Sequence, residues 1–265
     1  MSDSRAAKRK AKDKAFYVKS AKQAKKSAFE LGPGQKGFIC TTNNREKESI
    51  REAYNLLNEY ADILYGSQKV TDKTEPEGAE VTVKKESTEI EDELSKEVAD
   101  LKNETKKPET RRFQSVVTGV KNCAFIKTTL DDPLELQEAI MKSLEKKKEQ
   151  KTRFLLRMLP ILSTCKPIPD DIMAAAKPII AEHLANFKSF AIIIKIRNNN
   201  LKREDVIVPM ADLVKDLFPE IKVDLDHAEI CIIVEVLRIT CCIGVVPNYF
   251  GRAKYNLVEL AQKAQ

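Results

Sequence analysis

The sequence has little of what metal sites and many catalytic sites require. It contains only two histidines, His183 and His227, and none of its six cysteines forms a C-x-x-C pair. Structural zinc needs paired ligands at short spacings, so we expect no metal site. Five of the six cysteines lie in apolar or β-branched stretches, where a thiol behaves as a small hydrophobe. We therefore expect reduced core cysteines, a reducing compartment and no cofactor.

Long hydrophobic runs are also missing. No apolar stretch approaches the roughly 18 residues that cross a bilayer. The chain starts with charged residues rather than with the apolar core of a secretory signal. We therefore expect an intracellular protein with no membrane partner. The hydrophobic fraction of 42% is still sufficient for packed cores in one or two domains.

Charge is abundant and unevenly distributed. Residues 1–26 hold ten Lys and Arg against two Asp, whereas residues 72–110 hold thirteen Asp and Glu against seven Lys. Segments of low hydrophobicity and high charge cannot repay the entropy of ordering. We therefore predict a basic disordered tail over 1–31 and an acidic disordered linker over 66–110. The run Lys8–Lys14 is typical of a nuclear localisation signal or a phosphate-binding arm, with a plain solvated tail as the alternative. It favours a nuclear or nucleolar protein, and leaves a cytoplasmic fraction open.

The first half of the remaining sequence alternates strand-like and helix-like segments. A β-type run over 36–42 is followed by Asn43 and Glu46 at the spacing of a capping box. The next helix carries an apolar stripe, which consists of Ile50, Tyr54, Leu57, Ala61 and Leu64.

After the acidic linker, runs 113–120 and 123–129 have the composition of two strands. Asp132 with Pro133 is typical of a helix start, and this helix should end near Lys148. A strand over 153–162 completes the order βαββαβ, which is the split βαβ of ferredoxin-like folds. We therefore predict an α+β protein whose N-terminal ferredoxin-like domain spans 32–65 and 111–150.

The second half contains a further α+β unit, which we predict over 151–260. Asp170 can cap a helix in which Pro178 should produce a kink or a division. Residues 190–197 form a strongly β-branched strand, and a helix over about 205–218 follows. Residues 229–246 are long enough for two strands and apolar enough to be buried on both faces.

Basic residues fall on single faces of two predicted strands. Because alternate residues of a strand point to opposite sides, Arg153 and Arg157 share a face, and so do Lys195 and Arg197. Arginine binds phosphate in a bidentate way, although an ordinary solvated sheet face would have the same pattern. No aromatic pair of the RNP type lies on these strands, so contact through phosphate and shape is favoured over base stacking. Together with polar residues of the adjoining loops, the candidate RNA-binding residues are Arg153, Arg157, Lys166, Lys195, Arg197, Asn198, Lys202 and Arg203.

The C-terminal half resembles a THUMP domain. The similarity lies in Cys165–Pro167, His183-Leu184, Ser189–Arg197, Lys222–Leu225 and Ile233–Val236. Further downstream, Cys242–Gly244 and Lys254–Leu257 resemble the ending of the eukaryotic THUMP proteins that assist tRNA cytidine acetylation. The resemblance covers about 36–65 and 111–260.

This resemblance implies both a fold and a role. It implies a ferredoxin-like domain before the THUMP module, and a tRNA whose acceptor 3′ end is bound by the THUMP domain. It also implies a partner, an RNA cytidine acetyltransferase that forms N4-acetylcytidine in the D-arm of serine and leucine tRNAs. By analogy, Arg153, Arg157, Lys195 and Arg197 become candidate tRNA contacts.

Catalytic motifs are not evident. The sequence has no Gly-rich phosphate loop and no deaminase pattern of the H-x-E…P-C-x-x-C type. Pro247–Phe250 faintly resembles an amino-methyltransferase loop but lacks its second Pro, and Cys241 and Cys242 should point to opposite faces of a strand. We therefore expect two structural histidines, no catalytic residue and no small-molecule substrate. The favoured function is a tRNA-binding adaptor for the acetyltransferase; a small RNA-modifying enzyme and a general scaffold for structured RNA are the alternatives.

Overall fold

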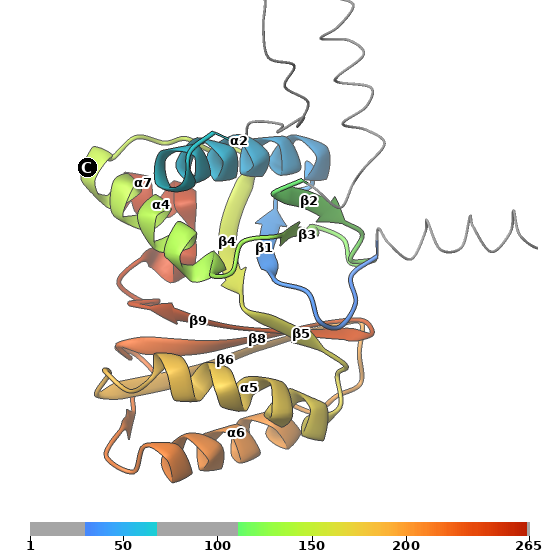
Figure 1. The fold of residues 1–265 in the computed structure, drawn as a ribbon, viewed down its shortest axis with the longest axis vertical. Coiled ribbons are helices and arrows are strands. Elements are labelled where there is room, and N and C mark those ends of the chain that lie inside the picture. Colours follow the sequence, from blue (N-terminus) through green and yellow to red (C-terminus); the bar gives the residue numbers. More distant parts are fainter. Residues whose placement is uncertain (1–29, 68–110, 264–265) are drawn as a thin grey trace, which may run out of the picture.

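The computed structural model describes residues 30–67 and 111–263. The predictions of a basic tail over 1–31 and an acidic linker over 66–110 lie almost entirely outside the described residues. The described chain forms two β-sheets, each associated with helices. Figure 1 shows the first sheet with α2 (Glu46–Tyr65) and α4 (Pro133–Lys147) in the upper half, and the second sheet with α5 (Pro169–His183) and α6 (Glu204–Leu217) below.

The first sheet is antiparallel and has the strand order β2-β3-β1-β4. Its strands are β1 (Gly37–Thr42), β2 (Phe113–Val116), β3 (Cys123–Thr128) and β4 (Leu155–Ile161). Along the chain the order is β1, α2, β2, β3, α4, β4. Phe38 and Cys40 of β1 pack with α2 and α4, and Ile39 between them belongs to the core on the opposite face. This alternation follows from the two-residue period of a strand.

Two of the predicted strands are shorter than expected. The predicted strand 113–120 ends at Val116, because the Thr118 hydroxyl donates to the carbonyl oxygen of Cys123 and closes a turn. The predicted strand 153–162 begins only at Leu155. The N–H groups of Arg153, Phe154 and Leu155 all donate to the Glu52 carboxylate of α2, so the segment before Leu155 is held by a helix instead of by a neighbouring strand.

The predicted capping box of α2 is wrong. Its N-cap is Arg45, without a capping side chain, and the Glu46 carboxylate accepts the N–H of Asn122 at 2.6 Å. The buried face is also turned relative to the predicted stripe, since Leu64 is 41% exposed. The buried residues of α2 are Ser49, Ala53, Leu56, Leu57, Tyr60 and Ala61. In α4, by contrast, Asp132 is the N-cap as predicted and accepts the N–H of Leu134 at 2.8 Å.

The second sheet has the strand order β5-β9-β8-β6-β7. Its strands are β5 (Ser163–Cys165), β6 (Ser189–Arg197), β7 (Lys222–Val223), β8 (Ile230–Leu237) and β9 (Thr240–Pro247). β6 runs parallel to β8, and β8 and β9 form an antiparallel hairpin. Every residue of β8 is buried, which confirms the prediction for this part of the chain.

The helix α5 does not begin as predicted. It begins at Pro169 after the N-cap Ile168, so Asp170 lies in its first turn and does not cap it. The helix continues through Pro178, so of the predicted kink or division, the division does not occur in this described segment. Proline at the first helical position suits the start, because the missing N–H would have no partner there.

The two layers share a core. One face of the second sheet packs on α5 and α6, and the other face meets the first sheet. Side chains of six strands form the apolar contact between the sheets, among them Ile39, Val116, Phe125, Ile161, Leu237 and Cys242. Gly244 permits β9 to approach β4 closely, because a Cβ atom there would collide with the carbonyl oxygen of Pro160.

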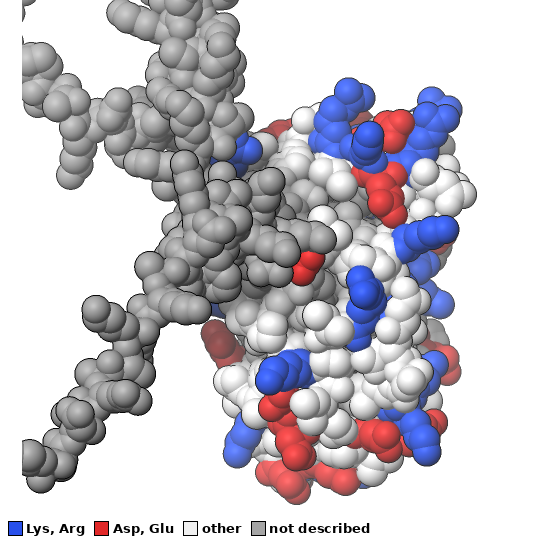
Figure 2. All heavy atoms as spheres, turned by 90° about the vertical axis from the view of Figure 1, so that its right-hand side faces the viewer, with Lys and Arg blue, Asp and Glu red and all other residues white. Residues whose placement is uncertain are grey.

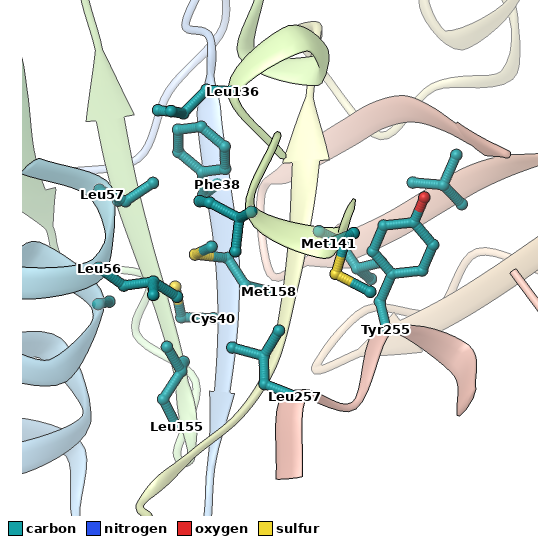
Figure 3. Packing of buried hydrophobic residues seen from close by; sticks show 14 of the residues in the cluster. Phe38, Cys40, Leu56, Leu57, Leu136, Met141, Leu155, Met158, Tyr255 and Leu257 are labelled. Atoms are coloured by element: carbon teal, nitrogen blue, oxygen red, sulfur yellow. The ribbon is translucent and has the colours of Figure 1, made fainter. Parts of the chain in front are cut away.

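The C-terminal segment packs against both layers. It contains the short helix η2 (Ala253–Tyr255) and α7 (Leu257–Lys263). Figure 3 shows Tyr255 beside Met141 of α4, and Leu257 toward the strands of the first sheet. Among the described helices, none is both long and apolar enough to cross a membrane.

Candidate RNA-binding surface

Lys195 and Arg197 of β6 share a face, as predicted, and they pair with a carboxylate that the sequence analysis did not single out. Lys195 Nζ lies 3.5 Å from Glu235 Oε1, and Arg197 bonds the other oxygen. Glu235 stands directly beside Lys195 in the parallel β6–β8 register. Its side chain is 1% exposed, whereas those of Lys195 and Arg197 are 31% and 28% exposed. Two cations on one carboxylate leave the cluster positive, with its cations toward solvent.

One feature of the sequence could have identified Glu235 as a partner of basic residues. It is the single charged residue within the apolar run Ile230–Leu237. A buried carboxylate must be paired or protonated, so a Glu in such a strand predicts a nearby cation. The parallel partner strand, whose position the sequence does not specify, supplies that cation.

Arg153 and Arg157 do not lie together on one strand face. Arg153 precedes β4 and is exposed, whereas Arg157 lies within β4 and is half-buried. The Arg157 Nε is buried without a hydrogen-bond partner among the described residues. Arg157 forms an isolated backbone bridge with Asn256, so it lies beside the C-terminal segment, and its charge lowers the pKa of Tyr249, which burial raises. The predicted pair is therefore divided between the surface and the space between the layers.

A second group of basic residues lies at one edge of the second sheet. The carboxyl ends of β5, β6 and β8 meet at this edge, because these strands run in the same direction. Lys166 follows β5, and Asn198, Lys202 and Arg203 follow β6; all four are exposed. The neighbouring Asn199 donates from its side chain to the carbonyl oxygen of Arg238 at 2.6 Å and accepts the N–H of Leu201, which fixes the loop.

Arg238 is a further exposed cation at this edge. It occupies the turn between β8 and β9 with a positive φ of 54°. Its side chain lies over Gly119 of the first layer, where a Cβ atom would collide with the guanidinium. An Arg in the tight turn of a predicted strand pair was visible in the sequence, and it could have been added to the candidates.

The edge and the start of α2 lie on the same side of the molecule. The thiol of Cys123, at the start of β3, has its pKa raised to about 12 by burial. The charges of Arg197 and Lys195 lower that pKa, whereas those of Glu235 and Glu46 raise it. Cys123 packs in one cluster with Leu237, the register partner of Arg197, and the N–H of its neighbour Asn122 donates to Glu46, so the end of β6 and the first turn of α2 lie near each other although they come from different layers.

We call these residues together the basic surface. Figure 2 shows this side: Lys and Arg side chains stand at intervals from the top of the described part to its lower third, with uncharged surface between them, and acidic side chains lie among those at the top and at the lower end. The basic surface consists of Arg45, Arg153, Lys166, Lys195, Arg197, Lys202, Arg203 and Arg238, with Asn198 among them.

Among the groups considered for chemistry, the cysteines and Tyr249 are buried, whereas His227 is exposed. All six cysteines are free and buried, and Cys241 and Cys242 belong to cores on opposite faces of β9, as predicted. Tyr249 of the Pro247–Phe250 turn is buried. The His227 N–H donates to Asp224, and His183 lies 3.9 Å from the Glu182 carboxylate. Among the described residues, no cluster of three or more His, Cys, Asp or Glu could hold a metal ion.

Known proteins resemble this chain over most of its length. The family model of the THUMP domain matches residues 169–246. The chain is 40% identical over 261 residues to THUMP domain-containing protein 1 of Homo sapiens, covering 96% of this chain and 72% of the relative. It is 28% identical over 263 residues to tRNA acetyltransferase TAN1 of Saccharomyces cerevisiae, covering 90% of this chain and 89% of the relative. The solution structure of the THUMP domain of THUMP domain-containing protein 1 is 32% identical, with a TM-score of 0.25, and covers 29% of this chain and 85% of that one.

The matched residues run from α5 to β9, within the segment 151–260 in which the sequence resembles a THUMP domain. The resemblance is therefore confirmed. With 40% identity across most of both chains, this protein belongs to the family of THUMP domain-containing protein 1.

Proposed function

We propose that this protein binds tRNA on the basic surface and presents it to an RNA cytidine acetyltransferase, a separate polypeptide. The reaction at that enzyme is N4-acetylcytidine formation in the D-arm of serine and leucine tRNAs. The observation that carries the proposal is the gathering of exposed cations from both layers on one side of the molecule. The yeast relative is named tRNA acetyltransferase, which supports a role of this chain in tRNA acetylation.

The composition of the basic surface suits structured RNA. Arginine and lysine neutralise phosphates and release condensed counterions, so binding should weaken steeply with salt. Lys195 and Arg197 retain one net positive charge beside Glu235, and Lys166, Lys202 and Arg203 form no ion pair with any described residue. Lys166, Lys202 and Arg203 are exposed and so meet a polyanion at little desolvation cost, whereas Lys195 and Arg197 are about a third exposed.

The proposal includes a division of the chain into domains. We assign residues 32–65 and 111–150 to a ferredoxin-like domain and residues 151–260 to the THUMP domain. The strand β4, at the start of the second range, completes the sheet of the first layer. The order β1, α2, β2, β3, α4, β4 and the strand order β2-β3-β1-β4 support this assignment. Because β4 pairs with β1 while β5 directly after it pairs with β9, the two domains hold their RNA-facing residues on one rigid unit.

A second candidate function is that this chain itself transfers the acetyl group. The printed name of the yeast relative favours it. The chemistry of the thiols supports the adaptor instead: burial raises the pKa of Cys40, Cys123, Cys231 and Cys242 and so disfavours the thiolate that attacks an acyl donor. The pKa of Cys165 is lowered by a hydrogen bond with Cys241, but both thiols are buried.

One assay separates the two candidates. Purified protein is incubated with tRNA and acetyl-CoA, with and without the RNA cytidine acetyltransferase, and acetylcytidine is measured in digested tRNA. We expect product only when both proteins are present. Product from this protein alone would identify it as the enzyme, and equal product from the acetyltransferase alone would remove the adaptor role.

We also propose a nuclear or nucleolar location, on the basic run Lys8–Lys14. This run lies outside the described residues. A fluorescent fusion in which the lysines and arginines of the run are replaced by Gln should shift to the cytoplasm, and an unchanged distribution would contradict the assignment.

A further inference from the structure

Two guanidinium groups converge on one phenyl ring at the start of α2. The Cζ of Arg45 lies 5.4 Å from the ring centroid of Phe154, and the Cζ of Arg153 lies 5.3 Å from it. Arg45 and Arg153 are exposed and Phe154 is half-buried. We call these three residues the arginine–phenylalanine site. We propose that this site binds one unpaired nucleotide of an RNA, with the base stacked on the guanidinium–phenyl group and the phosphate between the arginines.

The site is held rigidly by α2. Glu52 of α2 accepts the N–H groups of Arg153, Phe154 and Leu155 at distances of 3.1, 2.9 and 2.9 Å. Arg45 is the N-cap of the same helix. Both arginines are therefore fixed relative to one element, and a ligand binding between them need not order the backbone, which favours affinity.

The guanidinium groups of the site can bind an anion. Two carboxylates, Glu48 and Glu52, lie near the two arginines, so the site has no formal surplus of charge. Arg45 has an exposed partner, Glu48, at 3.4 Å, and such pairs contribute little. The Glu52 carboxylate is engaged by backbone N–H groups, and Arg153 forms no ion pair with any described residue. The donors of Arg153 are therefore available for a phosphate.

The flat groups of the site select an aromatic ring. A guanidinium stacked on a phenyl ring keeps its edge donors free for phosphate and offers a planar face to a base. A nucleotide supplies both a planar base and an anionic phosphate. In an RNA duplex the faces of the bases are covered by their neighbours, so the ligand is an unpaired nucleotide in a loop, a bulge or a single-stranded end.

The site extends RNA contact beyond the matched THUMP residues. Arg45, Arg153 and Phe154 lie outside residues 169–246. Glu46, next to Arg45, accepts the N–H of Asn122, whose neighbour Cys123 packs with Leu237, the register partner of Arg197. The site and the β6 cations therefore lie at the same end of the molecule. One RNA could contact both, and in this respect the inference rests on the proposed function.

Two RNA probes test the inference in the full-length protein. One is a short labelled oligouridylate, and the other is a blunt RNA duplex with the same number of phosphates. Arg45→Lys with Arg153→Lys keeps both charges but loses the planar groups, and Phe154→Leu keeps an apolar side chain without the ring. We expect each variant to bind the oligouridylate about tenfold more weakly and the duplex within about twofold of the original protein. The control, Lys142→Ala with Lys146→Ala on the exposed side of α4, should leave the ratio of the two affinities unchanged.

Each other outcome has a defined meaning. Unchanged oligouridylate binding by both variants, in a protein that still binds tRNA, overturns the nucleotide site and leaves the proposed function intact. Equal loss for both probes identifies a phosphate contact without stacking and also overturns it. If polyglutamate displaces labelled oligouridylate as effectively as unlabelled oligouridylate does, the site binds acidic peptides instead, and the nucleotide proposal is overturned. Failure of the original protein to bind any RNA contradicts the proposed function itself. Thermal melting of each variant checks its folding. If Phe154→Leu unfolds, the variant with Arg45→Lys and Arg153→Lys tests the proposal by itself.

Discussion

At the scale of single residues, Glu235 determines how the β6 cations are presented. A carboxylate moved from water into a protein interior loses several kcal/mol of hydration, and close cations restore part of it. Lys195 and Arg197 supply these cations and are held in place in return. Their side chains remain about a third exposed, so they can still meet a phosphate. The carboxylate thus fixes the positions of the two cations while removing one unit of charge.

Replacing Glu235 by Gln should therefore reduce stability. The change leaves two neighbouring cations without an anion and buries an amide in place of a hydrogen-bonded carboxylate. Breaking a buried pair costs about 3–5 kcal/mol, and we expect about 2 kcal/mol here because both cations retain contact with water. Urea unfolding measures the loss. Glu220→Gln removes the same charge from an exposed position and should unfold at the same urea concentration as the original protein; an equal midpoint for Glu235→Gln would show that the pair does not stabilise the fold.

At the scale of elements, the C-terminal segment is fastened to α4 by Arg252. Its Nε lies 2.9 Å from Glu145, and its Nη1 donates both to Glu138 and to the hydroxyl of Tyr255. The Arg252 side chain is almost fully buried, and its two carboxylates keep its pKa above the usual range against the opposing effect of burial. The planar fork of arginine suits this task, because two carboxylates at different angles need two donor edges.

Loss of the Arg252 guanidinium should weaken the packing of the C-terminal segment on α4. Arg252→Met keeps the length and apolar stem of the side chain but leaves Glu138 and Glu145 unpaired beside buried Tyr255, and we expect a loss of about 3 kcal/mol. Chemical denaturation measures it, and amide hydrogen exchange should show the largest increase in α7. Arg51→Ala, an exposed arginine on α2, serves as the matched control. Exchange in α7 that stays at the original rate would contradict the assigned role.

Elements whose ends are set locally could be predicted from the sequence, and those set by distant residues could not. The Asp132 cap of α4 needs only its own turn, and it was predicted correctly. The start of α2 depends on Asn122, and the start of β4 depends on Glu52, about a hundred residues away in the chain. The basic pair on β6 followed from strand parity because β6 is regular. The pair Arg153 and Arg157 did not, since Arg153 precedes the strand and the β1–β4 register shifts beside Thr41.

The edge formed by the ends of β5, β6 and β8 should contribute to RNA binding as one unit. Lys166, Lys202 and Arg203 are exposed there, so their joint replacement by Ala should not destabilise the fold. On a duplex the logarithm of the binding constant falls by about 0.9 per phosphate for each unit of log salt. We expect the slope for tRNA to decrease by roughly 2 to 3 in the triple variant. Binding titrations at several salt concentrations measure this slope. Replacement of Lys142, Lys146 and Lys215 by Ala is the control and should change the slope less. Equal changes for the two triple variants would mean that the edge does not contribute more to tRNA binding than other exposed lysines.

At the scale of the whole molecule, the two layers together support the basic side chains as one unit. The sheets share a core through Ile39 and Cys242, and Arg252 holds the C-terminal segment on the first layer. The basic surface therefore has a fixed geometry, although its residues come from segments more than a hundred residues apart. A rigid surface of this kind can orient a structured RNA, since little conformational entropy is lost on binding.

A presenting role makes a specific kinetic prediction. If the protein delivers tRNA to the acetyltransferase, weakening the edge should raise the KM for tRNA and leave kcat nearly unchanged, because binding is lost equally from the ground state and the transition state. We expect the Lys166, Lys202 and Arg203 triple variant to raise KM roughly in proportion to its loss of tRNA affinity. Steady-state acetylation with both proteins present measures this, and saturating tRNA should restore the rate. A fall in kcat at unchanged KM would instead mean that these side chains contact the acetyltransferase, since an effect that saturating tRNA cannot overcome does not arise from weaker capture of tRNA.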